Sequence, residues 1–376
     1  MRVKKWLASS AYTFELPKGC VYCAEGRKLV LLVTGLCHFN CFYCPLSAEK
    51  RGKDVVYADE MPVKSDEDVL LEAELIGAKG TGITGGDPLF VIEKSVHYIK
   101  ILKEVFGTAH HIHLYTSQTD EDKIKRLAHA GLDEIRFHPP PQTWGKISND
   151  YKKAIKLSQK LGLSAGFEVP SIPDMKKQLL SLIKSAQEVG ADFINLNELE
   201  FSETNVAELN KRGYSVKDEI SAAVKGSEEL AYQILNMDFD IPIHYCSASF
   251  KDSIQLRRRI KNRAKSVARP YDIITDDGTL LRGVIEECSK EYMAYIAKRY
   301  KISPEYIEFD EKRKRILVAP WVLEEISTNI PYPCYLVEEY PTWDALEVER
   351  EPLNDVAYKK AKIIISNKKS RSTKQL

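Results

Sequence analysis

The stretch KLVLLVTGLCHFNCFYC, residues 28–44, places three cysteines directly after an apolar run. The run Lys28–Thr34 has the length and the apolar content of a buried β-strand. Cys37, Cys41 and Cys44 follow it with the spacing Cys-x3-Cys-x2-Cys. We therefore expect a strand that ends in a loop built to hold a metal group.

Three thiols this close together can bind three irons of a [4Fe–4S] cube and leave the fourth iron without a protein ligand. A structural zinc ion or an electron-transfer cluster would use four protein ligands, and the next cysteine in the chain is Cys246. An iron without a protein ligand is a site for chemistry on a molecule that binds it. The spacing leaves one alternative open, a zinc knuckle that also uses Cys20 and Cys23.

This segment resembles the cluster loop of the radical S-adenosylmethionine (SAM) enzymes, which carry their iron–sulfur cluster after the first strand of a barrel. The resemblance covers roughly residues 25–245, and within the superfamily the chain looks most like archaeal relatives of the pyruvate formate-lyase activating enzyme. It implies that SAM chelates the open iron through its amino and carboxylate groups. It also implies that an electron from the cube cleaves SAM to a 5′-deoxyadenosyl radical, which abstracts hydrogen from a substrate.

The composition is that of a soluble globular chain of 376 residues, 44% hydrophobic and 29% charged, with a net charge of +1. No stretch reaches the ~18 apolar residues that a membrane span needs, and the N-terminus lacks the apolar core of a signal peptide. Five of the eight cysteines lie within residues 20–44, which indicates metal binding in a reducing compartment rather than disulfides. We expect a cytoplasmic protein without membrane contact.

After residue 25, strand-like runs alternate with segments of helical spacing. The predicted strands are Lys28–Thr34, Thr81–Gly85, His111–Thr116, Asp133–Phe137, Leu163–Val169 and Asp192–Asn197. The predicted helices are Asp66–Ala78, Val91–Phe106, Asp120–Ala130, Tyr151–Leu161 and Met175–Val189. This alternation predicts an α/β fold with parallel strands joined by crossover helices. It fits the partial (β/α)6 TIM-like barrel of the superfamily, with its chemistry at the carboxyl ends of the strands.

From about residue 270 the pattern changes to that of a small α+β accessory domain. Tyr271–Leu281 predicts two strands around an Asp-Gly turn, and further strand-like runs are Arg315–Val318 and Cys334–Glu338. Ile241–Tyr245 is a candidate edge strand of the barrel. The expected regions are an N-terminal extension with further metal ligands at 1–24, the barrel at 25–250, and the accessory domain with a basic tail at 270–376.

The loop Gly85-Gly86-Asp87-Pro88 follows the second predicted strand and resembles the Gly-Gly-Glu-Pro motif of the superfamily, whose backbone approaches the SAM amino group. Asp stands here in place of the more frequent Glu. For Thr116 and Ser117, capping of the next helix is an alternative role, and for Glu168 it is a structural ion pair. The expected cofactor contacts are Gly85, Gly86, Asp87, Pro88, Thr116, Ser117, Tyr43 and Glu168.

Other polar side chains stand at the ends of later strands. Arg136 could clamp a carboxylate, and His138 precedes three prolines and could only shape the loop. Strand alternation directs Asn195 and Asn197 to one face, where they could form the floor of a substrate site. A solvated loop is the alternative there, and no catalytic side chain can be named.

A second metal site is a further prediction. Cys20 and Cys23 supply two thiolates at a spacing common to zinc and iron–sulfur sites, and His244 and Cys246 could complete the set. Cys288 and Cys334 are alternative donors, although each could be buried as a small apolar residue. Spacing does not separate a second iron–sulfur cluster from zinc.

The leading interpretation is therefore a radical SAM enzyme, with a peptide or protein substrate favoured and a ferredoxin or flavodoxin as electron donor. An RNA-modifying enzyme of the same superfamily is an alternative. Another is an iron–sulfur or zinc protein that binds nucleic acid, because basic residues gather at Arg257–Lys265 and in the tail Lys359–Leu376. Such runs are more often solvated faces or disordered ends.

Overall fold

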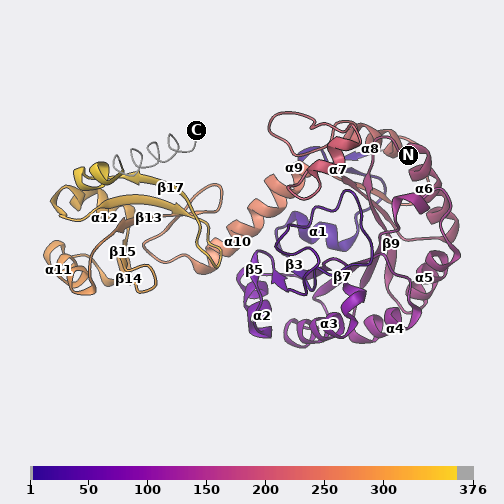
Figure 1. Cartoon of the computed structure of the whole chain (residues 1–376). Coiled ribbons are helices and arrows are strands. Elements are labelled where there is room, and N and C mark those ends of the chain that lie inside the picture. The colour runs from indigo at the N-terminus through magenta and orange to yellow at the C-terminus, as the bar shows by residue number, and fades with distance from the viewer. Residues whose placement is uncertain (1–2, 362–376) are drawn as a thin grey trace. The chain divides into compact units, whose positions relative to one another are not determined.

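The computed structural model describes residues 3–361, and the chain divides into two compact units, Met1–Arg259 and Ile260–Leu376. The first unit is built on an eleven-stranded sheet in which the strands from β11 to β3 are all parallel, in the order β11-β10-β9-β8-β7-β6-β3 (Figure 1). These strands are β3 (Lys28–Leu32), β6 (Gly80–Thr84), β7 (His111–Thr116), β8 (Glu134–Phe137), β9 (Ser164–Ser171), β10 (Ile194–Glu198) and β11 (Ile243–Cys246).

Helices connect successive parallel strands and lie on the outer side of the curved sheet in Figure 1. They are α2 (Asp66–Leu75), α3 (Ile92–Phe106), α4 (Glu121–Ala130), α5 (Asn149–Lys160), α6 (Lys176–Val189), α7 (Val206–Lys211) and α8 (Ser227–Leu235). The short helix α9 (Ala248–Phe250) and the longer helix α10 (Arg257–Val267) follow β11. Gly131 and Gly190 end α4 and α6 in the left-handed conformation, as expected where glycine terminates a helix.

Short antiparallel strands extend both ends of the sheet. At one end β3 pairs with β4 (Tyr57–Ala58), which pairs with β5 (Met61–Pro62). At the other, β11 pairs with β2 (Ala11–Tyr12), and β2 with β1 (Lys4–Lys5). The N-terminal segment also contains α1 (Lys18–Ala24), which Figure 1 shows inside the curve of the sheet.

The α/β class and all six predicted strands are confirmed, and each of the five predicted helices is present within a few residues. The expectation that Ile241–Tyr245 forms an edge strand is wrong in its position. β11 lies inside the sheet because Ala11–Tyr12 folds back to pair with it. Within the described residues β3 and β11 are not paired with each other, so the strand order is open and the partial barrel stays a prediction.

The two faces of the parallel strands differ in chemistry. In β7, Ile112 and Leu114 are fully buried in the core beneath the helices, whereas the alternate residues His113 and Tyr115 face the other side. The same alternation holds in β10, where Asn195 and Asn197 both bond to Glu168 of β9. The concave side of the sheet is therefore lined by polar side chains, which is the condition for a binding site.

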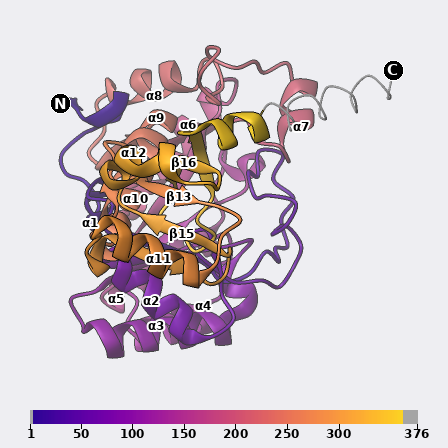
Figure 2. The ribbon, with the colours of Figure 1, turned by 90° about the vertical axis from the view of Figure 1, so that its left-hand side faces the viewer.

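The second unit contains an antiparallel sheet in the order β14-β15-β13-β16-β17, with β12 paired to β13. Its elements are β12 (Ile273–Ile274), β13 (Leu280–Ile285), α11 (Lys290–Tyr300), β14 (Ile307–Asp310), β15 (Arg315–Val318), α12 (Pro320–Ile326), β16 (Cys334–Glu339) and β17 (Glu347–Pro352). The predicted hairpin is confirmed, with Ile273 opposite Leu281 and Gly278 at a positive φ of 87°. Helices α11 and α12 pack on the sheet through Ile296 and Leu323 (Figure 2).

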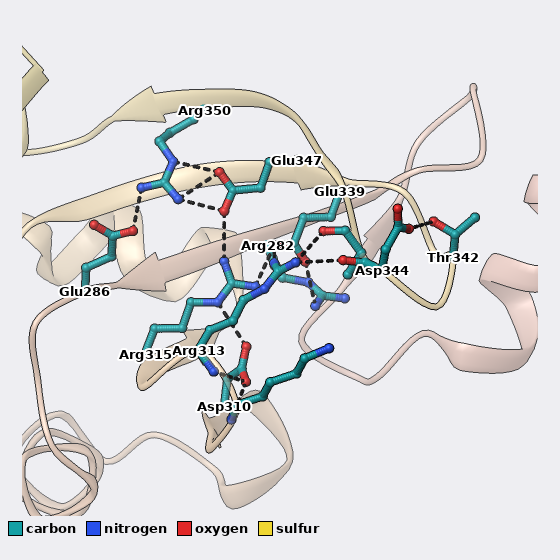
Figure 3. Close-up of polar contacts among 12 residues, drawn as sticks. Arg282, Glu286, Asp310, Arg313, Arg315, Glu339, Thr342, Asp344, Glu347 and Arg350 are labelled. Atoms are coloured by element: carbon teal, nitrogen blue, oxygen red, sulfur yellow. Dashed lines mark hydrogen bonds and ion pairs between the residues drawn. The ribbon is translucent and has the colours of Figure 1, made fainter. Parts of the chain in front are cut away.

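A charge network ties the strands of this sheet together (Figure 3). The buried carboxylate of Glu339 accepts hydrogen bonds from Arg282, Arg313 and Arg315 at distances of 2.5–3.2 Å. Arg315 and Arg350 also pair with Glu347 of β17. The donors of these arginines are thus used within the unit, which gives them a structural role. Of the predicted basic tail Lys359–Leu376, residues 362–376 lie outside the described residues, and Lys360 pairs with Glu286.

The spacing of the parallel strands can be tested at Gly80. A Cβ on Gly80 would lie 2.3 Å from the carbonyl oxygen of His111, on the neighbouring strand. Gly80→Ala should therefore lower the free energy of unfolding by about 1–3 kcal/mol through overpacking. Gly145→Ala, whose Cβ would meet nothing within 4 Å, is the matched control. Urea midpoints that are equal for the two variants would contradict this strand spacing.

Candidate functional site

A cavity of about 590 Å³ lies on the concave side of the first unit's sheet. Its lining brings together three regions that are far apart in sequence, namely the cysteine loop, the loop after β6, and the ends of β7 to β10. Of the predicted site residues, those on the lining are Cys23, Cys37, Cys41, Cys44, Tyr43, Gly85, Gly86, Pro88, Thr116, Ser117, His138, Glu168 and Asn197. Asp87 lies directly behind this wall.

The cysteine loop is held in place from both sides. Gly35 at its base donates to the carbonyl oxygen of Lys53 at 2.8 Å. At its end, the Asn205 side chain donates to the carbonyl oxygen of Tyr43 at 3.1 Å, and Thr204 donates to that of Cys44 at 3.3 Å. These side chains precede α7, so the segment after β10 fixes the position of the third cysteine.

The three thiols have the chemistry that an iron–sulfur cluster needs, because all three come from one loop and line one cavity. Burial raises the pKa of Cys37 and of Cys41, so both are thiols at neutral pH until a cluster takes their protons. Within residues 3–361 no three Cys, His, Asp or Glu side chains already surround a single metal ion. A cube does not need the three thiols around one point, because each thiolate binds a different iron.

The loop after β6 is pressed against the base of the cysteine loop. The backbone amide of Gly86 donates to the carbonyl oxygen of Thr34 at 2.7 Å, and the backbone amide of Asp87 donates to the carbonyl oxygen of Leu36 at 2.8 Å. A Cβ on Gly86 would lie 2.1 Å from the Leu36 carbonyl oxygen. Neither Gly85 nor Gly86 has a positive φ, so these residues are glycines because two backbones meet there.

The Asp87 carboxylate, buried to 1% exposure, connects this loop to the end of β7. It accepts hydrogen bonds from the Thr116 hydroxyl at 2.8 Å, the Ser117 amide at 3.0 Å and the Leu89 amide at 3.0 Å. Burial raises the pKa of Asp87 although these bonds act against the shift. Asp87 thus links the loop after β6 to the end of β7, and the Thr116 hydroxyl donates its proton to Asp87.

Tyr43 is joined to the far wall of the cavity by a hydrogen bond that the sequence did not predict. Its hydroxyl lies 2.8 Å from Nε2 of His138, and Nδ1 of His138 lies 2.7 Å from the carbonyl oxygen of Glu168. A carbonyl oxygen can only accept, so Nδ1 carries the proton and the Tyr43 hydroxyl donates to Nε2. Burial lowers the pKa of His138, which keeps this ring neutral.

The Glu168 side chain belongs to a buried ion network. Its carboxylate accepts from Arg136 at 2.6 Å, and from Asn195 and Asn197 at 2.9 Å each. Burial alone would raise the pKa of Glu168, but Arg136 and the two amides bring it below its ordinary value. Arg136 also pairs with Glu134 at 2.5 Å, so its guanidinium clamps carboxylates of the chain itself.

The deep end of the cavity is lined by Cys23, which the sequence analysis predicted as a metal ligand, and by Lys28, His113 and Tyr115, which it did not name as site residues. Burial lowers the pKa of Lys28 to about 8, and its Nζ lies 3.3 Å from Nδ1 of His111. The signal for this floor is the run of polar residues at every second position of β7.

The residues predicted for a second metal site lie on two elements of the first unit. Cys20 and Cys23 are on α1, and His244 and Cys246 are on β11. The alternative donors Cys288 and Cys334 belong to the second unit. There Cys334 is packed in the core beside Ile285 and Ile316, as expected of a small apolar residue.

Comparison with known proteins finds relatives that are radical SAM proteins, as expected from the three-cysteine loop. Residues 31–162 match the model of the radical SAM superfamily. A protein of Methanocaldococcus jannaschii is 43% identical over an alignment of 357 residues, and the match covers 90% of this chain and 93% of that protein. It is provisionally named a glycyl-radical enzyme activating enzyme. The chain belongs to the radical SAM superfamily.

As a member of the radical SAM superfamily the chain is an enzyme, and the superfamily uses a [4Fe–4S] cluster with SAM. Residues 278–353, within the second unit, match a domain of unknown function (DUF8061). Within the described residues, no helix combines the length and the apolar character that crossing a bilayer requires.

Solved structures of the superfamily are more distant. Streptococcus suis SuiB bound to S-adenosylmethionine is 12% identical with a TM-score of 0.40, over 59% of this chain and 50% of that one. Methylornithine synthase (PylB) is 13% identical with a TM-score of 0.39, over 59% and 69% of the two chains. The chain thus spans half the length of SuiB, and likeness at this level carries no functional argument.

The contact between the two loops generates a prediction for Gly86→Val. The added side chain would strike the Leu36 carbonyl oxygen, so the glycine loop and the base of the cysteine loop must separate. We expect the affinity for SAM to fall at least about tenfold, a loss of about 1.4 kcal/mol, and the iron content of the reconstituted protein to fall with it. Isothermal titration and iron analysis measure the two effects.

Gly145→Val is the control, since that position is open. A folded Gly86→Val protein with native SAM affinity would show that this loop takes no part in the site.

Proposed function

We propose that Cys37, Cys41 and Cys44 hold the [4Fe–4S] cluster and that SAM binds its open iron within the 590 Å³ cavity. One observation carries this proposal: the three thiols, the backbone of Gly85–Gly86 and the end of β7 all line that cavity. When bound, the cluster and SAM supply an electron transfer and a 5′-deoxyadenosyl radical. The protein's contribution is to hold, orient and enclose them.

The side chains and backbone around the cavity could hold and orient the cluster and SAM. The Gly85–Gly86 backbone lines the cavity and would approach the methionine amino group. Thr116 and Ser117 would contact SAM, and their positions are set by their hydrogen bonds to Asp87. Tyr43 would line the cavity beside Glu168, with His138 linking the Tyr43 hydroxyl to the Glu168 backbone carbonyl.

We also propose that the parallel sheet is the partial (β/α)6 barrel of the superfamily, with α1 inside it. The curvature of the strands in Figure 1 and the polar concave face support this assignment. Residues 25–250 would form the barrel and 270–376 the accessory domain.

For the substrate, we propose a glycine residue in a partner protein, from which hydrogen would be abstracted. The name of the M. jannaschii relative supports this choice, since that protein is named as an activating enzyme of a glycyl-radical enzyme. The cavity reaches the surface at the cluster loop, where Cys37 is exposed. A loop of a partner protein can enter there, and a small redox protein such as a ferredoxin or flavodoxin can deliver an electron over a short distance.

The alternatives have less support. Nucleic-acid binding rested on two basic runs, and most of the tail Lys359–Leu376 lies outside the described residues. In the other run, Arg259 is paired with Asp59 and Glu60. A second metal site at Cys20, Cys23, His244 and Cys246 is an independent proposal, because its failure would leave the SAM cluster unaffected.

The cluster assignment predicts the products of a simple assay. Anaerobically reconstituted, reduced protein should convert SAM to 5′-deoxyadenosine, measured by liquid chromatography. Replacing Cys37, Cys41 and Cys44 together by Ala should reduce this to the buffer background, since each thiolate would hold one iron. Cys288→Ala, in the second unit, should retain the wild-type rate. If the triple variant keeps its iron and its cleavage activity, the assignment is wrong.

The substrate assignment predicts where the abstracted hydrogen comes from. Cells of the source organism are grown on glycine deuterated at Cα, and their soluble proteins are incubated with the reduced enzyme and SAM. Mass spectrometry should then detect deuterium in the 5′-deoxyadenosine that forms. Protease treatment of the extract should abolish the transfer and ribonuclease should not. Transfer that depends on RNA, or 5′-deoxyadenosine formed without deuterium, would overturn the choice of a protein glycine.

A further inference from the structure

Four potential metal ligands outside the SAM site lie on two elements of the first unit. Cys20 and Cys23 are three residues apart on α1, a spacing that places side chains on one helix face. His244 and Cys246 are two residues apart on β11, which places them on one face of the strand. Each element thus carries two potential metal ligands on one of its faces.

The two pairs face the same interior. His244 stands opposite Asn195 in the parallel register of β11 and β10, and Cys246 stands opposite Asn197. The Asn195 amide reaches back to Sγ of Cys20 at 3.7 Å. Cys246 is in electrostatic range of both Cys20 and Cys23. The strand pair and the helix pair therefore meet on the concave side of the sheet.

His244 is the observation that points to a ligand. Its side chain is 2% exposed, and neither ring nitrogen has a hydrogen-bond partner among the described residues. The ring contacts Trp6 edge-on at 5.8 Å between centroids, which satisfies neither nitrogen. Leaving a buried polar group unpaired costs about 1–3 kcal/mol, and a neutral imidazole nitrogen is among the commonest metal ligands in proteins.

The surroundings of Cys20 suit a bound thiolate. Its sulfur lies 3.6 Å from Nη2 of Arg136, in addition to the Asn195 amide. Two N–H donors directed at one sulfur are the kind of outer contact that orients a metal-bound thiolate and balances its charge. The side-chain oxygen of Asn195 is also buried without a hydrogen-bond partner among the described residues. Polar atoms beside the four ligands therefore lack the hydrogen bonds that a folded interior normally provides.

We propose that Cys20, Cys23, His244 and Cys246 bind a single Zn²⁺ ion. Three cysteines and one histidine are a common structural zinc set, and Zn²⁺ takes four such ligands in a tetrahedron. Of the four, Cys23 lines the cavity, Cys20 and His244 are buried, and Cys246 is partly exposed. Four-iron clusters are usually held by cysteine thiolates, so a histidine in the set favours zinc. Among the described residues no three such side chains are already placed to hold a metal ion, so the four would have to move to meet it.

The position of the ion gives it a structural task. α1 directly precedes β3, the first strand of the parallel run, and β11 is the last. These two strands share no hydrogen bonds, so the sheet is open between them. A zinc ion held by α1 and β11 would link the segment before the first strand to the last strand. It would also fix Cys23 at the deep end of the SAM cavity.

The test is metal analysis of the full chain, prepared anaerobically with iron and zinc both supplied. Wild-type protein should contain about one zinc beside about four irons. Cys20→Ser with Cys23→Ser, and separately His244→Ala, should lose the zinc and keep the irons. The Cys37, Cys41 and Cys44 triple variant should do the reverse, which separates failure of this proposal from failure of the proposed function. Cys288→Ser is the control and should keep both metals.

Zinc K-edge X-ray absorption of the wild-type protein decides the matter if the variants do not fold. Three sulfur ligands and one nitrogen at zinc distances would support the site. Zinc-free protein, zinc bound through oxygen ligands, or about eight irons with no zinc would each overturn it.

Discussion

Two backbone hydrogen bonds hold the site together, from Gly86 to the Thr34 carbonyl and from Asp87 to the Leu36 carbonyl. They press the loop after β6 against the residue that precedes the first cysteine of the cluster loop. The Asp87 side chain then extends the connection to Thr116 and Ser117 at the end of β7. Three consecutive strand ends are thus fixed relative to one another by short, direct contacts, as a site that must hold a cluster and SAM in register requires.

The floor beneath this site is unusual in being charged. Arg136 is buried between Glu134 and Glu168, and burying such ions is costly unless each is paired. Removing Arg136 would take the buried positive charge away from both carboxylates, and breaking a buried ion pair in this way typically costs about 3–5 kcal/mol. The network holds Glu168 in one position at the cavity wall and supports α1 from below through Cys20. These contacts fix the side chains at this wall of the cavity, while Cys37 on the cluster loop is exposed.

The helices, the strands and the cluster loop could be predicted from the sequence because they depend on residues that are close together in the chain. Strand and helix positions follow from hydrophobic periodicity, and the cluster loop from the spacing of Cys37, Cys41 and Cys44. What could not be read depends on register between distant strands. The bond from Tyr43 to His138 spans 95 residues, and the role of Asp87 appears only when the end of β7 is placed beside it. Lys28 was missed as a site residue, and Cys23 was predicted as a metal ligand but not on this cavity, because its place there depends on α1 entering the curve of the sheet.

The central claim is that an iron left open by three cysteines binds SAM in the cavity between the cluster loop and Gly85–Gly86. Electron–nuclear double resonance of the reduced protein with SAM labelled with ¹⁵N at the methionine amino group tests it directly. The account predicts a hyperfine coupling from the labelled nitrogen to the cluster, which is lost in the Cys37, Cys41 and Cys44 triple variant. A reduced cluster whose spectrum shows no nitrogen coupling, with SAM bound at saturation, would contradict it.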